Sequence, residues 1–188
     1  MKLAAFLMFL LTSTAIAAEH LSLGGATPGL TRKQLESTVH GPLHCKQPDR
    51  PLKPVDANDV DCLRRADLAH SGFFSGSSPN HPITFVYRFR HGQLGAIFAL
   101  GLKPEEYAAL LSGLVAKFST PDKVEKPLAD KATGAPPDNQ WDGWTDGNNV
   151  LELRRVATRH AGAGLRLTAK WYRDELGKSG DLQSADGS

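Results

Sequence analysis

The chain has 188 residues, of which 22 are Lys or Arg and 20 are Asp or Glu, and its formal net charge is +2 with neutral histidines. A protein so close to neutrality lacks the basic surplus that nucleic acids or anionic membranes attract, so no nucleic-acid partner is expected. The length suits one domain with a sizeable core or two small domains.

The first 18 residues have the three parts of a cleavable secretory signal peptide. Lys2 precedes the apolar run 3–11, and small residues follow up to Ala17 and Ala18, after either of which cleavage fits. A bilayer span needs about 20 apolar residues, and Cys45 lies too far along the chain to carry a lipid. The sequence therefore predicts a periplasmic or secreted protein with no membrane span or lipid anchor.

The chain has two cysteines, Cys45 and Cys62. In an oxidising compartment an isolated pair most simply forms a disulfide bond, which here would stabilise the fold by roughly 3 kcal/mol through the loop that it closes. A metal or redox site is the alternative, because His40 and His44 lie nearby. A Gly-Pro pair separates these histidines, so they cannot share a helical face, and the disulfide is favoured. No metal or cofactor is predicted.

A short helix is predicted after Leu30. Thr31 can be its N-cap and Gln34 follows three residues later, which is the pattern of a capping box, while Leu30 and Leu35 can form a hydrophobic staple. The pair Gly41-Pro42 ends this helix.

Two strands are predicted at 83–90 and 93–100, joined by the two-residue turn His91-Gly92. A turn of this length fixes the register of a hairpin. The register predicts one apolar side, made of Ile83, Phe85, Tyr87, Phe89, Leu94, Ala96, Phe98 and Leu100, and one more polar side.

A second helix is predicted from Pro104, which suits the first position of a helix. Its apolar stripe recurs at steps of three and four residues and consists of Tyr107, Leu110, Leu111, Leu114, Val115 and Phe118.

Further strands are predicted at 140–145, 150–157 and 165–172, followed by a tail that is too polar to order. Acidic and amide residues between the first two of these strands allow a calcium loop or a hairpin turn. The EF-hand pattern fails because Trp144 and Leu153 occupy ligand positions, so the turn is favoured.

The two helices open alike, with Gly29-Leu30-Thr31 and with Gly101-Leu102-Lys103, 72 residues apart. This repeat predicts an α+β fold of two tandem helix-plus-antiparallel-sheet units, as one continuous domain or two. The expected organisation is a signal peptide at 1–18, a first unit at 19–101, a second unit at 102–173 and a disordered tail at 174–188.

The segment 29–35, together with Gly41-Pro42, resembles the motif of the SmpA/OmlA (BamE) family of outer-membrane assembly lipoproteins. The resemblance implies a helix packed on a small antiparallel sheet. The β-lactamase inhibitor protein family is similar to two such units in tandem. The matched positions begin and end a helix, so no functional residue is carried over, and this chain has no lipobox cysteine.

The sequence contains no nucleophile elbow, phosphate-binding glycine loop or HExxH motif. It therefore favours an exported, non-enzymatic protein that binds another envelope or secreted protein, as an inhibitor, an immunity protein or an assembly factor. A hydrolase with dispersed catalytic residues and a small-ligand carrier stay open as alternatives. The sequence leaves the oligomeric state open.

Two features are candidates for the binding surface. Trp141 and Trp144 are three residues apart in a predicted strand, so they point to opposite faces. Either both are buried or one is in the core and the other is exposed. Exposed aromatic residues often anchor interfaces. For the polar side of the predicted sheets, a solvated set of charges that protects the sheet edge is favoured, and a surface that meets an acidic partner is the alternative. The basic residues of this side are Arg88, Arg90, Arg154, Arg166 and Lys170.

Overall fold

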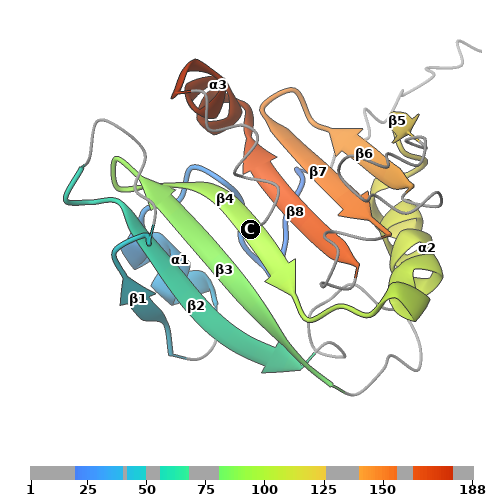
Figure 1. Ribbon diagram of the computed structural model, residues 1–188, viewed down its shortest axis with the longest axis horizontal. Helices are drawn as coiled ribbons and strands as arrows, with labels where there is room; N and C mark the ends of the chain where they lie inside the picture. Colours follow the sequence, from blue (N-terminus) through green and yellow to red (C-terminus); the bar gives the residue numbers. More distant parts are fainter. Residues whose placement is uncertain are drawn as a thin grey trace, which may run out of the picture.

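The computed structural model of the chain describes residues 20–39, 42–49, 56–67, 81–125, 140–155 and 163–179 (Figure 1). The predicted signal peptide lies outside the described residues. No helix in the described ranges is long and apolar enough to cross a membrane.

One antiparallel sheet of eight strands dominates the fold, in the order β1-β2-β3-β4-β8-β7-β6-β5 (Figure 1). The strands are β1 (His44–Lys46), β2 (Val60–Asp67), β3 (Pro82–Arg90), β4 (Gln93–Leu100), β5 (Lys123–Glu125), β6 (Trp141–Thr145), β7 (Asn149–Arg154) and β8 (Gly164–Ala169). The helical elements are α1 (Arg32–Thr38), the 3₁₀ turn η2 (Pro104–Glu106), α2 (Tyr107–Phe118) and α3 (Lys170–Ser179).

The predicted fold class, two tandem helix-plus-sheet units, is wrong. β4 pairs directly with β8, with Ala96 opposite Thr168 and Phe98 opposite Arg166. Backbone hydrogen bonds therefore run through the middle of the molecule, and all eight strands form a single sheet. The sequence pattern found strands in both halves but held no signal for the pairing of β4 with β8, which lie far apart along the chain.

The main core lies on one side of the sheet, called here the core face. α1 and α2 contribute Leu35, Leu110 and Leu114 to it, and these pack with inward residues of the strands such as Phe85 and Leu167. In Figure 1, α1 lies behind β2 and β3. The capping box of α1 is confirmed, because the Thr31 side chain accepts from the Gln34 backbone while the Gln34 side chain accepts from the Thr31 backbone.

The β3–β4 hairpin is confirmed, but the faces predicted for the side chains of β4 after Leu94 are wrong. Phe89 faces Leu94 as expected, whereas Arg88 faces Ala96, so Gly95 is an extra residue that forms a β-bulge. Beyond the bulge β4 is turned over. Ile97 and Ala99 therefore lie in the main core, and the predicted core residues Ala96, Phe98 and Leu100 lie on the opposite side.

Cys45 and Cys62 form the predicted disulfide bond. They are direct cross-strand partners in β1 and β2, two strands that the sequence pattern did not reveal. β2 carries Arg64 among its inward positions and Leu63 among its outward positions, so it shows no alternation of apolar and polar residues.

The end of the chain differs from the prediction. The last strand stops at Ala169, and α3 takes up Lys170–Ser179 where the sequence predicted the end of a strand and then a disordered tail. Tyr172 and Leu176 of α3, four residues apart, pack with Ala96 and Phe98 on the side of the sheet opposite the core face. This second small cluster holds the helix in place. Residues 180–188 lie outside the described residues.

Candidate functional site

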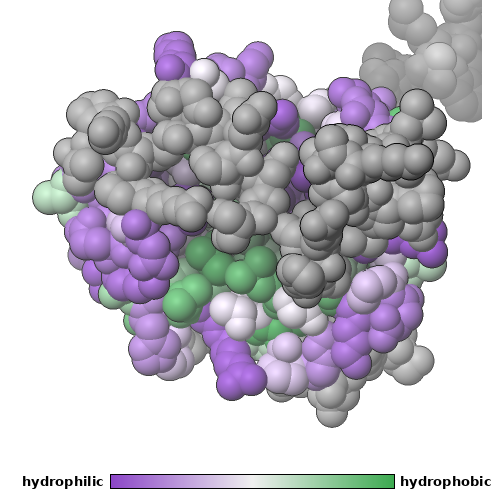
Figure 2. Space-filling model, viewed as in Figure 1, coloured by the Kyte–Doolittle hydropathy of each residue, from purple (hydrophilic) through white to green (hydrophobic). Residues whose placement is uncertain are grey.

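A groove of about 370 Å³ lies on the side of the sheet opposite the core face, called here the groove face. Its floor is made by β3 to β8, and α3 forms one of its walls. Figure 2 shows apolar residues gathered in the middle of the visible face between hydrophilic ones. Phe98 of β4 is half-buried in the groove, and Leu100 at the end of the same strand is exposed.

Basic side chains outnumber acidic ones in this groove. Two carboxylates line it, Glu125 and Glu152, and a third, Asp61, lies beside it as the partner of Arg88. The basic residues that line the groove are Arg88, Lys123, Arg154, Arg166 and Arg173. Among the described residues, the basic side chains at the groove therefore outnumber the carboxylates that line it or lie beside it.

Glu152 is 3% exposed and organises the centre of the groove. Arg166 Nε donates to Glu152 Oε2 at 2.7 Å, and Arg173 Nη1 lies 3.9 Å from Glu152 Oε1. One buried carboxylate thus serves two arginines. On the neighbouring side, Arg88 donates two hydrogen bonds to Asp61, at 2.9 and 3.0 Å, and its guanidinium lies 5.4 Å from the centre of the Phe98 ring.

Trp141 is half-buried at the β5–β6 end of the groove. Its indole Nε1 donates to Glu125 Oε2 at 2.9 Å, and Lys123 Nζ lies 5.1 Å from the ring centre. A Cβ at position 143 would lie 3.1 Å from this ring, so Gly143 leaves the space into which the indole packs. The ring is therefore fixed in the groove and stays partly exposed.

The wall made by α3 depends on a close approach at the bulge. A Cβ at position 95 would lie 2.5 Å from the Tyr172 ring, so only glycine lets the helix sit this close to β4. Burial is the main cause of the raised pKa of the Tyr172 hydroxyl. In the floor of the groove, Thr168 Oγ1 is buried and has no hydrogen-bond partner within the described ranges.

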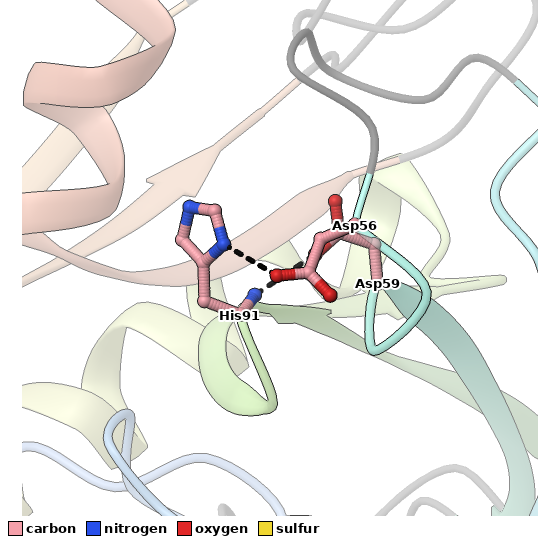
Figure 3. Close-up of side chains that lie close together, drawn as sticks. All are labelled: Asp56, Asp59 and His91. Carbon is pink, nitrogen blue, oxygen red and sulfur yellow. Dashed lines mark hydrogen bonds and ion pairs between the residues drawn. The ribbon is translucent and has the colours of Figure 1, made fainter.

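A second cluster lies at the β3–β4 turn, where Asp56, Asp59 and His91 offer ligand atoms within 4.8 Å of one another (Figure 3). His91 Nδ1 lies 2.9 Å from Asp56 Oδ2, and the His91 backbone N–H donates to Asp59 Oδ1 at 2.8 Å. Asp59 also forms an ion pair with Arg90, whose Nε donates to Glu175 Oε1 of α3 at 2.9 Å.

The charge of the carboxylates in this second cluster is balanced by a protein side chain, because the Arg90 guanidinium forms ion pairs with both Asp59 and Glu175. Hydrogen bonds to Asp56 and Glu175 raise the pKa of His91. Burial works to raise the pKa of Glu175, but the hydrogen bonds from Arg90 and His91 outweigh it and lower that pKa. The donor set is occupied by protein groups, so the cluster fits an ion-pair network that ties the turn to α3 better than a metal centre.

The structure brings four of the seven candidate binding residues together in the groove: Arg88, Trp141, Arg154 and Arg166. The other three lie elsewhere, and Lys170 is exposed at the start of α3. Arg90 is 1% exposed in the ion-pair network, and Trp144 is in the main core, where its indole N–H donates to the Ser119 carbonyl.

Sequence reasoning missed several residues of the groove, namely Glu152, Thr168, Tyr172 and Arg173. The last two belong to α3, which the sequence pattern did not predict. The favoured hairpin turn between β6 and β7 is confirmed, because the Asp146 carboxylate accepts hydrogen bonds from the backbone of Asn148 and Asn149.

No family model, curated protein or solved structure matches this chain. The function is therefore argued from the geometry of the groove.

Proposed function

We propose that this chain is an exported, non-enzymatic binding protein and that the groove is where it holds its partner, an acidic protein of the cell envelope or a secreted one. The observation that carries the proposal is that, among the described residues, basic side chains outnumber acidic ones in the groove that also holds the half-buried ring of Trp141. Such a protein would act as an inhibitor, an immunity protein or an assembly factor.

Two physical arguments support a protein partner. Arginine and tryptophan are the residues most enriched at the energetic centres of protein interfaces, where a planar guanidinium can pair with a carboxylate and an indole can fill a pocket. Charge complementarity then selects an acidic surface over a neutral or basic one. The groove supplies both residue types on a rigid sheet.

Export is supported by two features. The first 18 residues read as a signal peptide, and the Cys45–Cys62 disulfide suits an oxidising compartment.

The test is a crosslinked pull-down of the mature chain from its native envelope, with the bound proteins identified by mass spectrometry. Arg154→Glu and Arg173→Glu reverse charges in the groove, and Lys33→Glu makes the same change at an exposed position of α1, which packs on the core face. We expect one protein to be recovered with the wild type and with Lys33→Glu, and to be lost with both groove variants. Recovery that is equal for all four chains, with folding verified by circular dichroism, would overturn the proposal.

A further inference from the structure

The register of the sheet arranges the groove arginines along a diagonal. Arg166 of β8 is directly opposite Glu152 of β7, and Arg154 of β7 is directly opposite Gly164 of β8. Arg154 and Arg166 are therefore diagonal neighbours on adjacent strands, with Cα atoms about 7–8 Å apart. Both side chains line the groove.

Further groove residues lie on both sides of this arginine pair. Arg88 of β3 is opposite Ala96 of β4, which is opposite Thr168 of β8. Thr168 follows Arg166 by two residues, so the Cα atoms of Arg88 and Arg166 are separated by two strands and two residues, about 12 Å by strand geometry. At the other end Trp141 of β6 is directly opposite Arg154. The row therefore reads arginine, arginine, arginine and tryptophan across the groove face.

Side chains on one side of an extended chain repeat about every 7 Å, because each residue advances by 3.3–3.4 Å. This repeat matches the separation of Arg154 and Arg166, so carboxylates two positions apart in an extended segment reach both guanidinium groups. Paired hydrogen bonds between arginine and carboxylate make this match geometrically selective. An apolar residue two positions beyond the second acid would reach Trp141.

The hydroxyl of Thr168 is an independent sign of a ligand. It is buried in the floor of the groove, in the row of Arg88 and two residues along β8 from Arg166, and has no hydrogen-bond partner in the described part of the chain. Buried hydroxyls in native proteins generally have a partner. A carboxylate or a main-chain carbonyl of a segment lying along the diagonal would provide an acceptor there.

We propose that the groove recognises an extended segment of its partner that carries acidic residues at alternate positions, followed by an apolar residue. This inference rests on the proposed function, since it names the part of the partner protein that enters the groove. It adds a spacing rule, which a general attraction between opposite charges does not require.

The test uses synthetic peptides and isothermal titration calorimetry on the full mature chain. One capped peptide carries Glu-Thr-Glu-Thr-Leu in a serine background, a second has the same composition with the two glutamates adjacent, and a third places them four positions apart. We expect the alternating peptide to bind at least tenfold more tightly than the other two. Its binding should weaken with added salt, because the contacts are ionic.

Two variants and a control sharpen this test. Arg154→Glu should weaken the alternating peptide at least tenfold, and Lys33→Glu should leave it within twofold. Thr168→Val keeps the shape of the side chain and removes the hydroxyl, so it should weaken binding several-fold without lowering the unfolding midpoint. A several-fold loss accompanied by a lower midpoint would assign Thr168 a structural role and remove it from the inference.

The failure of the inference and the failure of the proposed function are distinguishable. Equal binding of the three peptides, or equally tight binding of a sulfated glycan of the same charge, would overturn the spacing rule. If the pull-down still recovers a protein partner that depends on Arg154 and Arg173, the proposed function survives that result. If the groove variants also leave the pull-down unchanged, the proposed function falls with the inference.

Discussion

Two groups of arginines on the same face of the sheet have opposite surroundings. At the β3–β4 turn Arg90 is 1% exposed and pairs with Asp59 and Glu175, so its charge is fully matched. At the β6–β7 end Arg154 and Arg166 line an open groove where basic groups outnumber acidic ones. Matched and buried charges hold elements together, whereas basic side chains that line an open groove can also meet an acidic surface. We therefore expect changes at the first group to affect stability and changes at the second to affect binding.

The largest effect is expected for Arg90→Met. The methionine fills part of the space but leaves the Asp59 carboxylate, which is 2% exposed, without its cation. Removing one partner of a buried ion pair typically costs about 3–5 kcal/mol. Urea denaturation at neutral pH should show a loss of this size, and a loss below about 1 kcal/mol would mean that the network is not structural.

Gly95→Ala should come next. Its Cβ would lie 2.5 Å from the Tyr172 ring, so α3 would have to shift away from the bulge in β4. Overpacking of this kind costs about 1–3 kcal/mol. The same variant should also weaken peptide binding, because Tyr172 and Arg173 form a wall of the groove. Unchanged thermal unfolding would show that the backbone absorbs the methyl group and that α3 does not depend on this approach.

A smaller effect is expected from pH. The hydrogen bond to Asp56 and, to a smaller extent, the hydrogen bond to Glu175 raise the pKa of His91 above its unfolded value of about 6.5. The stabilisation is therefore complete below about pH 6.5 and is lost as pH rises through the folded pKa. The free energy of unfolding should fall between about pH 6 and pH 8 in the wild type, and the difference between wild type and His91→Asn should shrink over the same range. A difference that is constant across this range would contradict a raised pKa of His91 in the folded protein.

The smallest effect on stability is expected for Arg154→Gln. Arg154 is half-buried at the groove and takes no part in the Arg90 network, so the free energy of unfolding should change by less than about 1 kcal/mol. The same variant should weaken the alternating acidic peptide. A loss of stability as large as that of Arg90→Met would remove the distinction between the two groups of arginines.

Local patterns were enough to predict several features. The capping box at Thr31 and Gln34, the turn His91-Gly92 and the Cys45–Cys62 bond all follow from residues that act over short distances or from a unique pairing. Four of the predicted binding residues also came together in the groove, because alternation along a strand assigns each side chain to a face.

Other features needed the whole fold. Gly95 reverses the two faces of β4 through a bulge, and an isolated glycine within a strand was the one signal of it. α3 is held in place because Tyr172 and Leu176 pack against Ala96 and Phe98. Ala96 and Phe98 lie on the groove face because of that bulge.

The sequence by itself determined the hairpins, the cap of the first helix and the disulfide bond, because neighbouring residues decide these through backbone geometry and short-range contacts. Only the tertiary structure decided that β4 pairs with β8, that Arg90 is buried while Arg166 faces a groove, and that a helix closes one end of this groove. These outcomes depend on long-range pairing and on burial, which are properties of residues distant along the chain.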